Sequence, residues 1–118
     1  MFKEKAKHAA DKLLPAFNSP TGIPFALVNL KTGLIQNYHW TTNRNVILSE
    51  YGTMSLEFNY LSDVTGEPIY REKVDKIRDV LKNMKKIDGL YPNFFSNTLG
   101  SWGLRMFLMI SIRFIYKY

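Results

Sequence analysis

Apolar residues recur at helical spacing in three stretches of this 118-residue chain. In the first stretch they stand at steps of three and four, at Phe2, Ala6, Ala9, Leu13 and Phe17. Lysines and Glu4 fill the positions between them, so the stretch predicts an amphipathic helix from Phe2 to about Phe17. Pro15 and then Pro20 are expected to end it, because proline cannot propagate a helix.

The second stretch starts near Asn45 and is apolar over most of a helical circumference. Its main stripe consists of Ile47, Tyr51, Met54, Phe58 and Leu61. A second apolar flank consists of Leu48, Leu56, Tyr60 and Val64. We therefore predict a single inner helix, with Asn45 as its N-cap and Gly66 as its left-handed stop.

The third stretch follows after about three residues and is apolar on one side only. Its stripe is Tyr70, Val74, Ile77, Leu81 and Met84, opposite a face of Lys, Arg, Glu and Asp. Pro68 stands near its first position, and Asp88-Gly89 should break it. An inner apolar helix followed by an outer half-charged one is typical of concentric helix layers. The pattern therefore indicates a partial α/α barrel, although periodicity alone would favour a plain helical bundle.

Between the first two helical stretches the pattern changes to short β-rich runs. The runs FALVNL and GLIQNYHW flank Lys31-Thr32-Gly33, which predicts a hairpin. An isolated hairpin is only marginally stable, so this one should pack on something larger. The predicted fold class is thus all-α with a small β-hairpin.

The composition fits one globular unit, since 46% of the residues are hydrophobic. A net charge of +6 hints at nucleic acid or an anionic membrane surface. The basic residues are interleaved with acids on two predicted helices, however, so we interpret them as solvated faces and expect no nucleic-acid partner. The absence of cysteine excludes disulfides and thiolate metal sites. No stretch has the length of a membrane span or the pattern of a targeting signal.

Carboxylates occur within the inner-helix stretch, where burial is expected. On one continuous helix Glu50, Thr53 and Glu57 would share a face, being at i, i+3 and i+7. Burying an unpaired carboxylate costs several kcal/mol, so this face must meet water, a cation or a polar cavity. It is either the solvent edge of the helix or the lining of a pocket for sugar hydroxyls or a water nucleophile.

Three segments resemble a known family in order and spacing. They are ADKLLPAFNSPTGIPFALVNLKTG, LSEYGTMSLEFNYLSDVTGEPIYREKVDKIRDVLKNM and DGLYPNFFSNTLGSWG. From about Phe2 to Leu104 the chain is similar to the class I α-1,2-mannosidases, glycoside hydrolase family 47, especially their Golgi-type members. The resemblance implies an α/α barrel with Ca²⁺ at its base. It also implies inverting removal of α-1,2-linked mannose from high-mannose Asn-linked oligosaccharides, at the membrane or in the lumen of the Golgi or endoplasmic reticulum.

The resemblance also implies site residues. In this family the acid of the SLEF segment lines the active-site cavity, and here only Glu57 matches it, so Glu57 is the expected catalytic residue. Whether it transfers a proton or holds sugar and water stays open. Glu50 in LSEYGT is typical of the family too, and is expected to support the cavity wall. The loops PTGIP and NLKTG could touch the glycan or serve only as turns.

The resemblance ends at about Leu104, before the last residues of the chain. The family continues after Trp102-Gly103 into a segment with another catalytic aspartate, where this sequence reads LRMFLMISIRFIYKY. A Glu-containing helix that precedes the family's equivalent of Phe2 has no counterpart here, and neither do the Ca²⁺ ligands. We therefore divide the chain into a partial catalytic domain, 1–104, and a divergent tail, 105–118.

Such a portion is predicted to be marginally folded and inactive, with Leu48, Leu56, Tyr60 and Val64 facing water. Two alternatives are a non-catalytic helical module that docks an acidic partner and a fragmentary gene product without independent function. His8 and His39 have no ligand-type residues at metal spacing, so both are expected at the surface. Trp40 and Trp102 could stack on sugars, and burial would explain them equally well.

Overall fold

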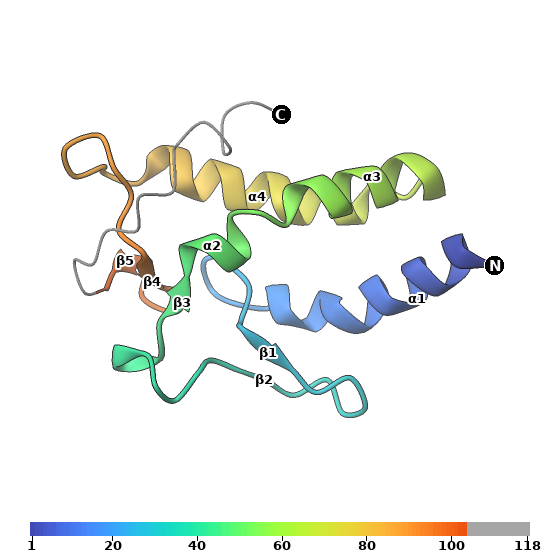
Figure 1. Cartoon of the computed structure of the whole chain (residues 1–118), viewed down its shortest axis with the longest axis horizontal. Coiled ribbons are helices and arrows are strands. Elements are labelled where there is room, and N and C mark those ends of the chain that lie inside the picture. Colours follow the sequence, from blue (N-terminus) through green and yellow to red (C-terminus); the bar gives the residue numbers. More distant parts are fainter. Residues whose placement is uncertain (104–118) are drawn as a thin grey trace.

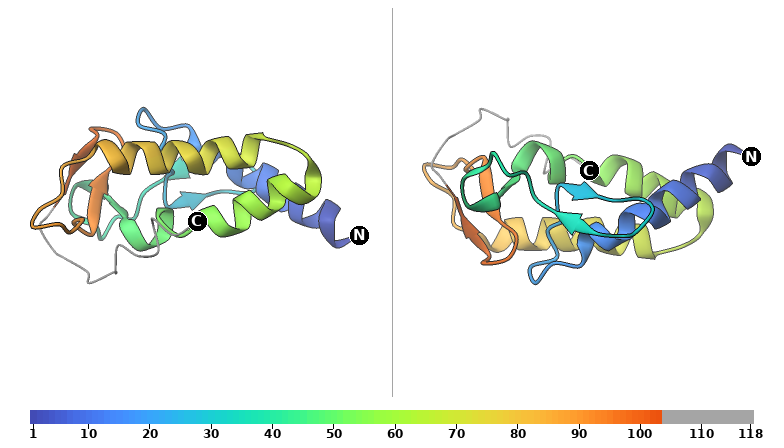
Figure 2. Two further views of the ribbon diagram at one scale, coloured as in Figure 1. Left: turned by 90° about the horizontal axis from the view of Figure 1, so that it is seen from above. Right: turned by 90° about the horizontal axis from the view of Figure 1, so that it is seen from below.

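The structure, a computed structural model, describes residues 1–103, so the predicted tail 105–118 lies outside the described residues. Three longer helices dominate: α1 (Phe2–Leu13), α3 (Ser55–Thr65) and α4 (Ile69–Asn83). Helix α1 lies below α3 and α4 in the view of Figure 1 and contacts α3. Figure 2 shows that α3 and α4 run side by side. The strands labelled β3, β4 and β5 lie at the end of the molecule away from the N-terminus, whereas β1 and β2 lie nearer its middle, below α1 in Figure 1.

Helix α1 ends one turn earlier than the pattern predicted. The chain passes from Leu13 into a 3₁₀ turn, η1 (Leu14–Phe17), which accommodates Pro15. Phe17 is buried, but Phe2 is 80% exposed, so the expectation that Phe2 faces the core is wrong. Figure 1 shows the first turn of α1 projecting past the end of α3, away from the buried residues of the core.

The inner helix is not continuous. Its first part is divided into strand β3 (Val46–Ile47) and the single turn α2 (Leu48–Tyr51), and α3 starts only at Ser55. Asn45 is buried before the strand and caps no helix, which corrects its predicted role. The backbone N–H of Leu48 donates instead to the carbonyl of Asn93, 2.8 Å away. Pairing with a distant strand thus overrides the local helical pattern.

That pairing belongs to a three-stranded antiparallel sheet that the sequence did not reveal. Strand β4 (Phe94–Ser96) lies between β3 and β5 (Ser101–Trp102), with Val46 opposite Phe95. The predicted hairpin is confirmed as β1 (Leu27–Val28) paired with β2 (Ile35–Gln36). Its turn needs Gly33, whose φ of 74° is favourable only for glycine.

The outer helix follows its prediction closely. Gly66 ends α3 in the left-handed conformation, with φ 76°, and Pro68 stands at the N-cap of α4. Helix α4 ends at Asn83, several residues before the predicted break at Asp88-Gly89. Asp88 and Gly89 both have positive φ and form a tight turn, closed by reciprocal backbone hydrogen bonds between Ile87 and Leu90.

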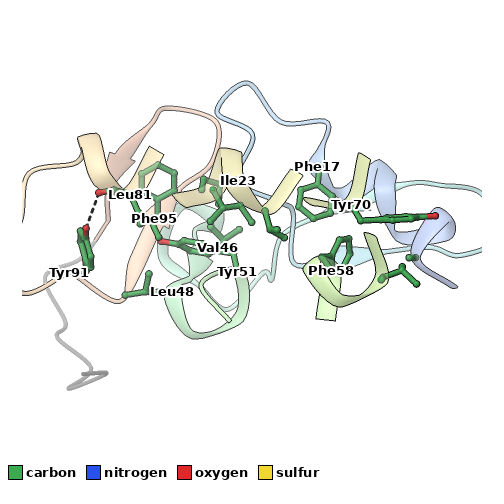
Figure 3. Packing of buried hydrophobic residues seen from close by; sticks show 14 residues of the cluster. Phe17, Ile23, Val46, Leu48, Tyr51, Phe58, Tyr70, Leu81, Tyr91 and Phe95 are labelled. Carbon is green, nitrogen blue, oxygen red and sulfur yellow. Dashed lines mark hydrogen bonds between the residues drawn. The ribbon is translucent and has the colours of Figure 1, made fainter. Parts of the chain in front are cut away.

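One hydrophobic core runs the length of the molecule (Figure 3). At one end Phe58 packs against the rings of Phe17 and Tyr70, and at the other end Phe95 packs between Tyr51 and Trp102. The predicted exposed flank is only partly exposed. Leu56 and Tyr60 face solvent, whereas Leu48 is buried and Val64 is half-buried. Leu48 departs from the prediction because β3 pairs with β4, and this pairing places α2, which directly follows β3, against the core.

Candidate functional site

Glu57 lies in the first turn of α3 with its side chain exposed. It borders a hollow of about 550 Å³ between α1 and α3. The remainder of the lining is apolar apart from Lys3, and consists of Phe2, Ala6, Ala9, Ala10, Leu13, Phe58, Tyr60, Leu61 and Val64. Glu57 therefore lies at the edge of a largely hydrophobic groove, and its catalytic role stays a prediction.

Glu50 lies on α2 and borders a different hollow, of about 280 Å³. This second hollow is formed by η1, the 24–26 loop, β1, β3 and α2, and its lining includes Val28 of the hairpin. Leu13 lies between the two hollows and contributes to both. The hollow beside the hairpin is therefore bordered by Glu50, whereas Glu57 borders the adjacent hollow between α1 and α3.

Because α2 and α3 are separate helices, the predicted polar face of Glu50, Thr53 and Glu57 does not form. Thr53 lies in the turn between them, where its hydroxyl donates to the backbone carbonyl of Ser49, 2.7 Å away. That bond occupies the Thr53 hydroxyl locally and closes α2. The prediction of a shared face is therefore wrong, since it assumed one uninterrupted helix.

Glu50 is held in place by an aromatic residue. The Tyr38 hydroxyl donates a 3.0 Å hydrogen bond to Glu50 Oε1. The accepting carboxylate, together with partial burial, raises the pKa of Tyr38, because a phenolate beside a carboxylate is disfavoured. At neutral pH the phenol is protonated, as tyrosines ordinarily are, so it is available as a donor that orients the Glu50 carboxylate.

Tyr38 also supports an exposed tryptophan. The rings of Tyr38 and Trp40 stack with centroids 5.3 Å apart and an interplanar angle of 25°. Trp40 is 68% exposed, so of the two alternatives left open for it, burial does not hold within residues 1–103. Trp102 differs, since it is half-buried against Tyr91 and Phe95 and donates its indole N–H to the Lys85 carbonyl.

The Tyr38, Trp40 and Glu50 side chains together form what we call the aromatic–carboxylate site. A flat, exposed aromatic face can cover the C–H face of a sugar ring, and an oriented carboxylate accepts hydrogen bonds from hydroxyls. Sequence reasoning considered Trp40 and Glu50 separately and did not consider Tyr38. No local signal pairs Tyr38 with Trp40, because residues 39–40 form a turn after β2 and the alternation of an extended chain does not apply to them.

The remaining candidate groups are placed as follows. His8 and His39 are exposed, as predicted. Within residues 1–103 no three His, Asp or Glu side chains come close enough together to hold a metal ion. The described residues therefore do not fit the Ca²⁺ site that the family resemblance implies, which needs six to eight oxygen ligands. No helix in this part of the chain has the length and apolarity needed to cross a membrane.

Comparisons with known proteins agree with the fold and with the resemblance. The sequence profile of Glycosyl hydrolase family 47 matches residues 1–112. The chain is 61% identical over 103 residues to mannosyl-oligosaccharide alpha-1,2-mannosidase IA of Drosophila melanogaster, covering 87% of this chain and 15% of the relative. It is 50% identical over 103 residues to the human mannosyl-oligosaccharide 1,2-alpha-mannosidase IB, covering 87% of the chain and 16% of that relative.

A solved structure is similar as well. An alpha-1,2-mannosidase from Trichoderma reesei superposes with a TM-score of 0.71 at 28% identity, covering 86% of this chain and 21% of the other. The chain therefore corresponds to about a sixth of the curated relatives and about a fifth of the solved structure. The predicted fold class, part of an α/α barrel with small β elements, is confirmed by this likeness. The boundary predicted at residue 104 stays a prediction.

Proposed function

Because the chain belongs to Glycosyl hydrolase family 47, we propose that it supplies part of the catalytic domain of an α-1,2-mannosidase. The proposed substrates are high-mannose Asn-linked oligosaccharides, and the proposed setting is the lumen of the secretory pathway. The names of the relatives support this proposal, since those proteins are called mannosyl-oligosaccharide mannosidases. The observation that carries it within the molecule is the aromatic–carboxylate site.

Two carboxylates are candidates for the sugar-binding side of the domain. The family resemblance points to Glu57, which borders the groove between α1 and α3. The geometry supports Glu50 more strongly, since Tyr38 orients its carboxylate beside an exposed aromatic face. We propose that Glu50 hydrogen-bonds the sugar or an attacking water, and that Glu57 acts from the neighbouring hollow.

Inversion requires two carboxyl groups on opposite sides of one sugar, one as acid and one as base, about 6.5–9.5 Å apart. Glu50 and Glu57 border separate hollows and so do not form such a pair between themselves. The proposed reaction therefore needs a further carboxylate beyond the described residues. The Ca²⁺ that the family resemblance implies would likewise take its ligands from outside residues 1–103.

A chimera tests the proposal. Residues 2–103 would replace the matching segment of the Drosophila melanogaster relative, and the release of mannose from α-1,2-mannobiose would be measured. We expect the chimera to hydrolyse the disaccharide and Glu50→Gln to lower kcat/KM by at least about 100-fold, the size of a lost acid–base or orienting carboxylate. Glu57→Gln is expected to lower it by at least about tenfold.

The matched control is Glu72→Gln, which changes an exposed glutamate on the charged face of α4. It should leave kcat/KM within a factor of two. A well-folded chimera without hydrolysis would contradict the proposed function. Full activity in Glu50→Gln together with loss of activity in Glu57→Gln would transfer the principal role to Glu57.

A further inference from the structure

The segment that carries the aromatic–carboxylate site contains a strained turn. Asn43 and Arg44 have φ of 55° and 54°, a left-handed conformation that side-chain-bearing residues rarely adopt twice in succession. This turn lies between Trp40 and strand β3, which leads directly into Glu50 on α2. Strain of this kind persists only where surrounding contacts determine the backbone, and it is frequent at binding sites.

This turn is held by a 3.0 Å hydrogen bond from the Arg44 N–H to the Thr41 carbonyl and by the buried carboxamide of Asn37. Its Nδ2 donates to the Arg44 carbonyl at 2.7 Å and to Asn97 Oδ1 at 2.9 Å, and its Oδ1 accepts from the Ala26 N–H at 3.1 Å. Only 6% of Asn37 is exposed. Asn37 directly precedes Tyr38, so the same carboxamide fixes both the strained turn and the start of the aromatic pair.

Asn97 fixes Asn37 in turn. It follows strand β4, is 1% exposed, and lies 60 positions away from Asn37 in sequence. Its backbone carbonyl accepts a 2.8 Å hydrogen bond from the Thr21 hydroxyl, and its Nδ2 donates to the Ile23 carbonyl. The Asn97 carboxamide is thus anchored by the 19–23 loop and by the sheet, which leaves its Oδ1 in a fixed position to receive Asn37.

We propose that Asn97 is a positioning residue for the aromatic–carboxylate site, acting through Asn37 on Tyr38, Trp40 and Glu50. The relay is short: Asn97 orients the Asn37 carboxamide, Asn37 holds Tyr38 and the Arg44 turn, and Tyr38 orients Glu50. The Thr41 hydroxyl adds a 2.9 Å bond to the Tyr38 carbonyl, which ties the two ends of this segment together. The assignment to sugar binding rests on the proposed function, whereas the relay itself does not.

The first measurement follows the Tyr38–Glu50 contact in the full 118-residue chain. Tyrosines labelled with ¹³C at the phenolic carbon would be titrated by NMR, with the Tyr38 signal assigned from Tyr38→Phe. The raised pKa of Tyr38 should fall toward that of an exposed tyrosine in Asn97→Ala, as it should in Glu50→Gln, which removes the acceptor charge.

The control is Ser62→Ala, which removes a buried side-chain acceptor of the Arg71 N–H at the distant α3–α4 connection. It should lower stability without moving the Tyr38 titration. A folded Asn97→Ala protein with an unchanged Tyr38 pKa would overturn the proposal. If Asn97→Ala does not fold, the unaltered chain decides, because Asn37 side-chain amide protons that exchange as fast as those of an exposed Asn would overturn it equally.

The second measurement adds the sugar. The Trp40 indole signal would be followed while methyl α-D-mannopyranoside is added, and Asn97→Ala should weaken binding at least fivefold. Binding by Asn97→Ala as tight as that of the unaltered chain would contradict the positioning role. If the unaltered chain does not bind the mannoside, the sugar site fails, while the Tyr38 titration still decides whether Asn97 positions Tyr38.

Discussion

The Tyr70 hydroxyl on α4 donates a 2.6 Å hydrogen bond to Asp11 Oδ1 on α1. These residues are 59 positions apart, and their bond joins the first helix to the outer helix beside the Phe58 ring. Lys7 completes the group, since its ammonium lies 2.9 Å from the other oxygen of Asp11. The N-terminal helix is therefore attached through a polar contact as well as through Ala10 in the core, and Phe17 of η1 adds a buried ring directly after the helix.

Tyr70→Phe should lower the free energy of unfolding by about 1–2 kcal/mol, the usual cost of losing a hydrogen bond to a charged group at a partly buried site. Chemical denaturation followed by circular dichroism measures the loss. Lys7→Met, which breaks only the exposed ion pair, should cost less than about 1 kcal/mol. Equal losses in the two variants would contradict a special role for Tyr70.

The same contact makes stability depend on pH at both extremes. The hydrogen bond from Tyr70, followed by that from Lys7, lowers the pKa of Asp11. The stability that ionised Asp11 contributes is complete above the ordinary carboxyl pKa of about 3.9, and it is lost as the pH falls through the lowered pKa. Burial, followed by the bond to Asp11, raises the pKa of Tyr70 to about 12, so stability should also fall as the pH rises from about 10 towards that value.

Denaturation series at pH 2–5 and 9–12 should show both slopes. Tyr70→Phe should flatten the alkaline slope and reduce the acid one, because it removes the phenol and leaves Asp11 with a less depressed pKa. If stability falls equally steeply above pH 10 in Tyr70→Phe and in the unaltered chain, groups other than Tyr70 cause the alkaline pH dependence.

Phe95→Ala should cost about 3–5 kcal/mol, because it removes a fully buried ring and leaves a cavity. Phe95 is in the central strand β4 and touches the rings of both Tyr51 and Trp102. Thermal and chemical unfolding measure the loss. Tyr60→Ala is the matched control, since Tyr60 is 68% exposed and its removal should change the free energy of unfolding by less than about 0.5 kcal/mol.

Gly66→Ala should destabilise the protein by about 1–2 kcal/mol, the cost of placing a side-chain-bearing residue in the left-handed conformation. A Cβ at this position would meet nothing within 4 Å, so backbone strain alone determines the effect. Gly66→Asn should cost less, because asparagine tolerates this conformation better. An Ala variant as stable as the unaltered chain would show that α3 can end without a left-handed residue.

Tyr51→Phe should leave the stability unchanged or raise it by up to about 1 kcal/mol, because a buried polar group without a partner costs free energy. Tyr51 is 2% exposed, and its hydroxyl has no hydrogen-bond partner within residues 1–103. Tyr91→Phe is the comparison, since it loses a 3.0 Å bond to the Leu81 carbonyl, visible in Figure 3, and should cost about 1 kcal/mol. A similar loss in Tyr51→Phe would indicate a partner beyond the described part of the chain.

Several elements could be predicted from the sequence because short-range chemistry decides them. The apolar stripe of α4, the glycine stop at Gly66 and the hairpin turn at Gly33 each depend on residues within a few positions of one another. Figure 2 shows the resulting antiparallel α3–α4 pair from above and below. The family could be identified for a similar reason, since a linear order of motifs is a property of the sequence itself.

The tertiary structure alone decided the break in the inner helix. Residues 46–47 have a helical pattern, yet they pair with residues 94–95, and no local signal announces a partner so far along the chain. Once β3 forms, α2 and α3 become separate helices, and Glu50 and Glu57 face different hollows. The predicted three-residue polar face failed for this reason.

The sequence by itself determined which side chains could serve a sugar site, because the chemistry of Glu50, Glu57 and Trp40 belongs to the residues. The tertiary structure decided which of them act together. Tyr38 contacts Glu50, 12 positions along the chain, and Asn97, which follows β4, contacts Asn37, 60 positions away. Buried carboxamides must find hydrogen-bond partners wherever the folded backbone provides them, so such groupings exist only once distant segments have packed.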